Sequence, residues 1–129
     1  MRFAFFGDIV GKTGRRALEA HLPDLRQTLA LDFVVVNAEN AAAGFGVTEK
    51  ICEGLCDLGV DALTLGNHAW DQRETLTYID REPRLLRPAN YPAGSTPGKG
   101  ANLIEAANGS RVLVVNLMGA LFMETLDDP

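Results

Sequence analysis

The sequence predicts an α/β protein with a mixed sheet and flanking helices. Three short apolar runs, at residues 2–6, 33–36 and 62–65, alternate with segments of helical periodicity, an order typical of parallel strands joined by helices. Beyond residue 82 proline and glycine become frequent, and two apolar runs flank Asn108-Gly109, which is a hairpin signal. We therefore expect parallel strands first and antiparallel strands after them.

Composition and charge are those of an ordinary soluble domain. The 129 residues suit one domain, residues 1–129, and contain 47% hydrophobic and 22% charged residues. The net charge of −5, with scattered Lys and Arg, argues against duplex DNA or RNA as a partner. No secretory leader or membrane-length apolar run is recognised, so we expect a cytoplasmic protein without a membrane partner.

The first apolar run should form a buried strand ended by Gly7, with a helix from about residue 13 to residue 29 after it. Pro23 should kink this helix or divide it into two segments. His21 lies on or near the apolar stripe. We expect it to be a packed, hydrogen-bonded histidine without a role as a ligand.

The segment Gly11-Lys12-Thr13-Gly14 invites comparison with a phosphate-binding loop. That motif requires a glycine five places before the glycine that precedes the lysine, and this position holds Phe6. The negative charge of Asp8 would also repel a phosphate unless a cation intervened. We therefore reject a nucleotide-binding domain and expect a turn that leads into the helix.

Two further strand–helix units follow. Thr48 is an expected N-cap for a helix that runs to Leu58. Asp71 and Glu74 resemble a capping box for a later helix that ends near residue 80. The two cysteines of the chain lie four residues apart in the first of these helices, and we expect small buried thiols rather than a zinc site.

The proline-rich part should contain shorter elements. Residues 85–87 are expected to form a strand, and residues 103–105 and 112–115 are expected to form the two arms of the hairpin. Three polar residues in this part could reach an anionic substrate, but solvated loop residues are the preferred interpretation: Arg87, Asn90 and Lys99.

Polar residues follow each of the first three predicted strands. Asp8 follows the first, Glu39 and Asn40 follow the second, and Asn67 and His68 follow the third. Because the carboxyl ends of parallel strands meet at one edge of a sheet, these side chains should converge. Carboxylate and amide oxygens suit hard or borderline divalent metals, although the same residue types also serve as caps and turn formers.

A pair of metal ions would explain such a cluster. Two ions about 3.5–4 Å apart can stabilise the attacking and leaving oxygens of a phosphoryl transfer. Two divalent ions against the carboxylates of Asp8 and Glu39 would leave a net positive site that attracts a phosphate ester. An imidazole beside them, that of His68, could protonate the leaving oxygen.

The motifs at these strand ends resemble those of the calcineurin-like metallophosphoesterase superfamily, and most closely its bacterial YmdB-like branch. The resemblance spans residues 1–129 and is carried by three segments: Phe6-Gly7-Asp8, Asn37-Ala38-Glu39-Asn40 and Leu65-Gly66-Asn67-His68-Ala69-Trp70-Asp71. It implies half of an α/β/β/α sandwich. It also implies a dinuclear site with iron or manganese, or alternatively zinc or magnesium, and hydrolysis of phosphate esters such as 2′,3′-cyclic nucleotides.

The resemblance also implies residue roles. Asp8, Glu39, Asn40 and Asn67 would be metal ligands, with Glu39 bridging the two ions, and His68 would be the general acid or would stabilise the transition state. The sequence departs from the wider superfamily at Val10, where a metal-binding histidine usually stands.

Members of this family are about twice as long as this chain, and their second half supplies further histidine ligands. The 129 residues therefore resemble the N-terminal half of a metallophosphoesterase domain. Such a half should expose an apolar face, which predicts a homo-oligomer or pairing with a complementary C-terminal chain. The alternative function is a catalytically silent half-domain that acts as an oligomeric or regulatory binding module.

Overall fold

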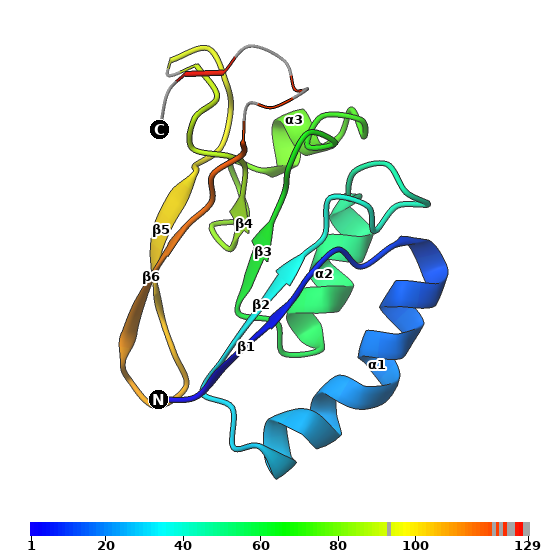
Figure 1. Cartoon of the computed structure of the whole chain (residues 1–129), viewed down its shortest axis with the longest axis vertical. Helices are drawn as coiled ribbons and strands as arrows, with labels where there is room; N and C mark the ends of the chain where they lie inside the picture. The colour runs from blue at the N-terminus through cyan, green and yellow to red at the C-terminus, as the bar shows by residue number, and fades with distance from the viewer. Residues whose placement is uncertain (93, 120, 122, 124–125, 128–129) are drawn as a thin grey trace.

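The computed structural model describes residues 1–92, 94–119, 121, 123 and 126–127. Its helices and strands follow one another along the chain as shown in Figure 1. In order they are β1 (Phe3–Phe6), α1 (Gly11–Thr28), β2 (Phe33–Asn37), α2 (Glu49–Asp57), β3 (Ala62–Thr64), α3 (Thr75–Tyr78), β4 (Leu85–Leu86), β5 (Ala101–Glu105) and β6 (Arg111–Val115).

The strands form two sheets. The first has the order β1-β2-β3-β4 and all its pairs are parallel, while β5 and β6 form a separate antiparallel pair. The predicted α/β class and the hairpin are confirmed, but the parallel and antiparallel strands do not share one mixed sheet. A parallel bridge between Leu86 and Lys99 leads the chain from β4 toward β5.

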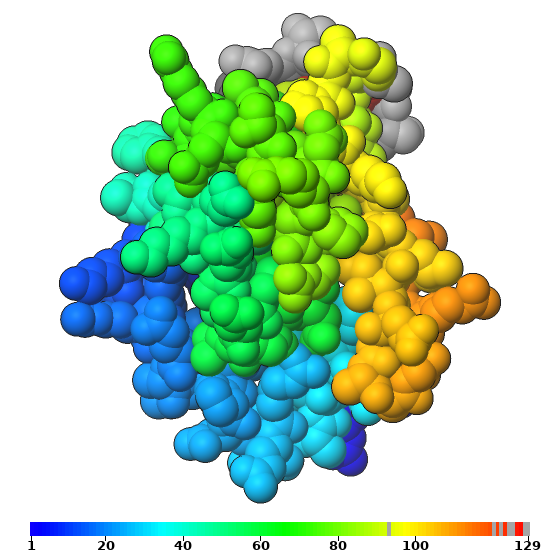
Figure 2. Space-filling model, turned by 180° about the vertical axis from the view of Figure 1, so that it is seen from behind, coloured from blue at the N-terminus to red at the C-terminus, as the bar shows by residue number. Residues whose placement is uncertain are grey.

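Three layers enclose the core. The main cluster packs α1 and α2 against one face of the parallel sheet, with Leu22, Val36 and Leu63 fully buried. A smaller cluster packs the hairpin against the other face, around Phe33 and Ala62. Seen from behind in Figure 2, α1 (blue) and the hairpin (yellow to orange) lie on opposite flanks of the molecule.

Helix α1 buries Leu18 and Leu22 but leaves its His21 exposed. The expectation of a packed histidine is therefore wrong, because the core-facing stripe of the helix passes beside this residue. The helix is continuous through Pro23, so the predicted division into two segments does not occur. It starts at Gly11, about two residues earlier than expected, so the segment expected to turn the chain is the first turn of the helix.

Helix α2 begins as its sequence predicts. The Oγ1 atom of Thr48 accepts a hydrogen bond from the backbone N–H of Ile51 at 3.2 Å, which confirms the N-cap. Cys52 and Cys56 are free and buried, as expected. A hydrogen bond with Cys56, together with burial, raises the pKa of the Cys52 thiol, so this thiol stays protonated.

The predicted capping box at Asp71 and Glu74 is wrong. Helix α3 starts only at Thr75, and the Glu74 carboxylate accepts a hydrogen bond from the backbone N–H of Glu49 at 2.7 Å. This glutamate therefore caps the neighbouring helix α2 rather than its own. The contact between Glu74 and helix α2 replaces the predicted contact within the Asp71–Glu74 segment. The spacing of residues within that segment cannot indicate such a tertiary contact.

Two of the three expected solvated loop residues are buried instead. Arg87 is 8% exposed and donates hydrogen bonds to backbone carbonyls at Pro88, Ala89 and Pro97. Asn90 is 6% exposed, and its amide both donates to and accepts from the backbone of Met118, at 2.7 and 3.0 Å. Both side chains fasten the loops together, and neither is open to a substrate.

Lys99 is exposed, as expected. None of the helices in the described ranges is both long enough and apolar enough to cross a membrane.

Candidate metal centre

The three loops that follow β1, β2 and β3 meet at the carboxyl edge of the parallel sheet, at the top of Figure 1. Backbone hydrogen bonds hold them together. The N–H groups of Ile9 and Gly11 donate to the carbonyls of Asn37 and Asn40, at 3.1 and 2.9 Å. The predicted convergence of the three strand ends is therefore a feature of the fold.

Asp8 and Asn40 are in direct contact across this edge. The Nδ2 atom of Asn40 donates to Oδ1 of Asp8 at 2.6 Å, which leaves the amide oxygen of Asn40 and the second carboxylate oxygen of Asp8 for another partner. Asp8 has a φ of 45°, in the left-handed region that aspartate tolerates better than most residues. The backbone at Asp8 is thus held in an uncommon conformation that turns its carboxylate toward the second loop.

Glu39 lies against the third loop. A Cβ atom added to Gly66 would stand 2.2 Å from Oε2 and 2.5 Å from Oε1 of Glu39, so the carboxylate occupies space that only a glycine leaves open. Oε1 accepts a hydrogen bond from Nδ2 of Asn37 at 3.3 Å. Oε2 is buried and has no hydrogen-bond partner among the described residues.

An unpaired buried carboxylate oxygen is costly, since a buried charge requires a hydrogen bond, an opposite charge or a metal ion. The Oε2 atom of Glu39 meets this description, and it lies against Gly66, the residue that precedes Asn67. The donor set of this edge therefore fits a cation bound by carboxylate and amide oxygens.

His68 points toward a carboxylate of its own loop. Its Nδ1 atom lies 2.6 Å from Oδ2 of Asp71, and its ring meets the edge of Phe45 at 5.4 Å between centroids and 90° between planes. An ionised carboxylate can only accept, so Nδ1 carries the hydrogen in this contact. The Nε2 atom takes no part in this contact.

Sequence reasoning missed Asp71, Phe45 and Gln72 as members of this site. Nε2 of Gln72 donates to the carbonyl of Phe45 at 2.7 Å and holds the aromatic side chain beside His68. The spacing of His68 and Asp71 was an available signal, because residues three apart in a turn can meet. This spacing is equally consistent with a carboxylate partner for the imidazole and with a helix cap.

The structure brings two of the predicted residues into direct contact and places two others against neighbours that were not predicted. Asp8 contacts Asn40, Glu39 packs on the glycine that precedes Asn67, and His68 turns toward Asp71. Within the part of the chain that the structure describes, no three His, Cys, Asp or Glu side chains gather closely enough to hold a metal ion. The predicted ligand set contains two carboxylates, and its other members are amides.

Fold and site together define an α/β protein whose polar residues gather at the carboxyl edge of a parallel sheet. Comparison with known families identifies the kind of protein more closely. The family described as YmdB-like protein matches residues 4–129. The chain belongs to this family, which confirms the resemblance found in its motifs.

Known relatives and structures agree with this assignment. The chain is 47% identical over 129 residues to the 2′,3′-cyclic-nucleotide 2′-phosphodiesterase of Bacillus subtilis strain 168, covering 100% of this chain and 48% of the relative. A crystal structure of a hypothetical protein from Thermus thermophilus superposes with a TM-score of 0.91 at 45% identity, over 100% of this chain and 49% of that one. A crystal structure of a phosphatase from Mycoplasma pneumoniae gives 0.88 at 32% identity, over 98% and 47%.

The chain spans about half the length of the curated relatives it matches, between 43% and 48% of them. The match is to an N-terminal half, as the motifs predict. The relatives include a phosphodiesterase and a phosphatase, enzymes that act on phosphate esters. These enzymes are about twice as long as the 129-residue chain, and their activities are those of the longer proteins.

Proposed function

We propose that this chain forms the N-terminal part of a metal-dependent phosphodiesterase, with 2′,3′-cyclic nucleotides as the candidate substrates. The observation that carries the proposal is the Glu39 carboxylate, packed into the space left by Gly66 with its Oε2 atom buried and unpaired. This atom lies at the edge where Asp8 and Asn40 also meet.

In this proposal Asp8, Glu39, Asn40 and Asn67 would hold the metal ions, and Glu39 would be a ligand common to both. The family resemblance implies iron or manganese, and zinc or magnesium are alternatives because they too accept oxygen ligands. Bound ions of this kind supply Lewis-acid activation of a phosphate ester and stabilise the charge that develops in the reaction. The chain itself contributes the oxygen donors and the rigid backbone edge that fixes them.

His68 is proposed to give a proton to the leaving oxygen. Asp71 holds Nδ1 at 2.6 Å and so orients the ring, with Nε2 as the atom that faces the substrate. The Phe45 ring packs against the same imidazole and restricts its rotation. In this scheme Asp71 and Phe45 are positioning residues, because they act through His68.

Four oxygen donors are fewer than two metal ions need, so we propose that the site is completed by a homo-oligomer or by a complementary C-terminal chain. The second candidate function is a catalytically silent half-domain that serves as a binding module. The predicted ligand set, which holds two carboxylates and no histidine, favours this second function.

Hydrolysis of bis-p-nitrophenyl phosphate with added Mn²⁺ tests the proposal. We expect Asp8→Asn and Asn67→Ala to abolish metal-dependent hydrolysis in any active form of the protein. The matched controls, Asp24→Asn and Gln27→Ala, change exposed residues of α1 and should leave the rate unchanged. Full activity in both site variants would refute the assignment of the site.

Metal content separates the two candidate functions. Elemental analysis of protein purified by gel filtration should give close to two transition-metal ions per chain if the site is completed. A folded chain that binds little or no metal under these conditions would favour the silent binding module.

A further inference from the structure

Phe45 is an exposed aromatic side chain beside the proposed proton donor. The residue is 58% exposed, and its ring lies 5.4 Å from the ring of His68 between centroids, with the two planes at 90°. A perpendicular contact of this kind covers at most one face of the Phe45 ring. At least one face is therefore not used by His68, and an aromatic face is a surface on which a planar ring can stack.

The loop that carries Phe45 is fixed by its own backbone. The N–H of Phe45 donates to the carbonyl of Ala42 at 3.1 Å, and the N–H of Gly46 donates to the carbonyl of Glu39 at 2.6 Å. Gly46 has a φ of 75°, in the left-handed region that favours glycine. The loop therefore folds back onto the segment after β2 that holds Glu39, one of the proposed metal ligands.

A second set of contacts fastens this loop to the loop after β3, and both lie in the upper part of Figure 1. The Nε2 atom of Gln72 donates to the carbonyl of Phe45 at 2.7 Å. A Cβ atom added to Gly46 would stand 3.0 Å from Cγ of Gln72 and 3.1 Å from the carbonyl oxygen of His68, so the two loops touch here. These contacts, which place the Phe45 ring, all join residues between 39 and 72, on the two loops that also carry proposed site residues.

An aromatic ring on a fixed loop contributes to folding mainly through the apolar area that it buries. More than half of Phe45 is exposed, so this contribution is largely unused. Trp70, in the loop after β3, provides a contrast, because it packs against the main core cluster and meets the ring of Tyr91 at 5.9 Å between centroids. Phe45 is therefore an apolar platform beside the site that the core does not use.

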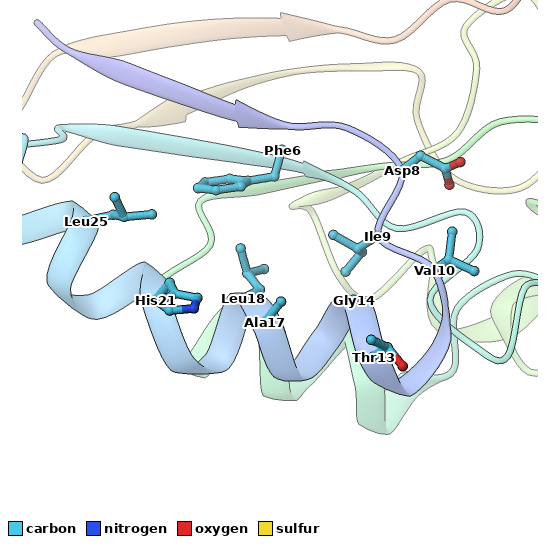
Figure 3. A pocket seen from close by; sticks show the side chains of 10 residues that line it. All are labelled: Phe6, Asp8, Ile9, Val10, Thr13, Gly14, Ala17, Leu18, His21 and Leu25. Atoms are coloured by element: carbon cyan, nitrogen blue, oxygen red, sulfur yellow. The ribbon is translucent and has the colours of Figure 1, made fainter.

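We propose that Phe45 is a base-binding residue of the site, and that the nucleobase of a bound nucleotide stacks on the face of its ring that His68 leaves free. This inference rests on the proposed function, in which the phosphate of a cyclic nucleotide lies at the metal edge. Asp8 directs its carboxylate to that edge, away from Leu18 and His21 of α1, as Figure 3 shows. The ribose separates base and phosphate in such a nucleotide, so a base-binding side chain must stand beside the reacting centre, as Phe45 stands beside His68.

Stacking on an aromatic ring recognises nucleobases as a class, because every base has a π-face. The platform therefore predicts binding of purine and pyrimidine nucleotides alike, and weaker binding of phosphate esters that lack a base. Loss of the Phe45 ring should weaken nucleotide binding about tenfold, which is equivalent to about 1.4 kcal/mol. The binding of a base-free phosphate ester should not depend on this ring.

Titration of the isotope-labelled chain, followed by nuclear magnetic resonance in the presence of Mg²⁺, tests the proposal without a catalytic step. The probe is adenosine 3′-phosphate, and glycerol 2-phosphate is its base-free counterpart. We expect the nucleotide to shift the amide signal of Phe45 and to bind about tenfold more tightly than glycerol 2-phosphate. Phe45→Leu should remove most of this preference, because leucine keeps apolar bulk beside His68 but has no π-face, whereas Phe45→Trp should retain it.

Phe3→Leu is the matched control. Phe3 is 68% exposed at the start of β1, whereas the proposed site lies at the carboxyl end of that strand, so both affinities should stay unchanged. Kinetics give a second readout in any active form of the protein. There Phe45→Leu should raise the KM for 2′,3′-cyclic AMP about tenfold and leave the KM for glycerol 1,2-cyclic phosphate unchanged.

Failure of adenosine 3′-phosphate to bind, or equal affinities for the two probes, would overturn the proposal, as would a preference that Phe45→Leu leaves unchanged. Binding of the nucleotide that depends on Phe45, without hydrolysis in any form of the protein, would support the platform and refute the catalytic proposal. Hydrolysis of both cyclic phosphates with the same change of KM in Phe45→Leu would support the catalytic proposal and refute the platform, so the two failures are distinguishable.

Discussion

Gly66→Ala should weaken metal binding at least tenfold while leaving the chain folded. The added Cβ would stand 2.2 Å from Oε2, 2.5 Å from Oε1 and 2.6 Å from Cδ of Glu39, whereas ordinary contact begins at 3.4 Å. To reach ordinary contact the carboxylate must therefore retreat by about 1.2 Å. Metal–oxygen distances tolerate about 0.2 Å, so a displaced Glu39 cannot remain a ligand in its present position.

The expected cost in stability is moderate, because the displaced atoms are the end of a flexible side chain. Overpacking of this kind costs about 1–3 kcal/mol, which lowers the Tm by about 4 °C per kcal/mol for a domain of this size. The affinity for Mn²⁺ should fall at least tenfold, since even changes behind the ligands of a metal site cost about 10–100-fold.

The assay is a titration of Mn²⁺ followed by the electron paramagnetic resonance signal of the free ion, together with a thermal melt. Gly54→Ala is the matched control: its added Cβ meets no described atom within 4 Å, and it lies inside α2. This control should keep its Mn²⁺ affinity and gain about 1 kcal/mol of stability. Unchanged affinity in Gly66→Ala would refute the role of the Glu39 carboxylate as a ligand.

Three further predictions concern the proton donor, the acid stability and the packing of the loops. Asp71→Asn should lower the kcat of the completed enzyme about tenfold with KM unchanged, and should alter its pH profile, because the charge that orients His68 is lost. Hydrogen bonds from Arg84 hold the pKa of Glu82 below its ordinary value of 4.5, so their stabilisation is present above this pH and is lost on acidification through the folded-state pKa. Glu82→Gln should thus lower the free energy of unfolding by about 1 kcal/mol at pH 7 and should flatten the acid denaturation curve. The value is small because the side chain of Arg84 is partly exposed and solvent screens the ion pair. Gly100→Ala should cost more than about 3 kcal/mol, because its Cβ would lie 2.1 Å from a backbone atom of the facing segment that cannot move aside.

The predictions for Glu82 and Gly100 have control variants, and each of the three has an outcome that would contradict it. Glu53→Gln, on the exposed side of α2, should leave the acid denaturation curve unchanged. Identical curves for Glu82→Gln and the unmodified chain would contradict the stabilising role of that ion pair. A melt of Gly100→Ala that matches that of Gly54→Ala would show that the facing backbone does yield. Equal changes of kcat and KM in Asp71→Asn would indicate loss of structure rather than loss of orientation.

Elements with a complete local signal were predicted well. The N-cap at Thr48 and the hairpin around Asn108-Gly109 need only neighbouring residues, and both appear in the structure. The convergence of the strand ends also follows from a general rule, because parallel strands all carry their carboxyl ends to one edge. For these features the residues that determine the structure lie close together in the sequence or obey a general rule of sheet topology.

Features that depend on a distant partner could not be predicted. Glu74 matches the local pattern of a cap, yet it bonds to the backbone of Glu49, which lies 25 residues away in the sequence. Arg87 and Asn90 were expected to be solvated because their types are usually exposed, whereas backbone carbonyls in other loops satisfy them. A sequence gives no measure of how many such carbonyls a neighbouring loop will offer.

The candidate metal centre also combines features that the local sequence predicts with contacts between distant residues. The sequence shows that Gly66 follows a strand. It does not show that the Glu39 carboxylate packs against this glycine, because that is a contact between two loops. Likewise, the local pattern predicts a cap at Asp71, whereas the turn at residues 66–71 brings this residue to His68. The residue types that perform the proposed chemistry were identified, and the residues that hold them in place were found only in three dimensions.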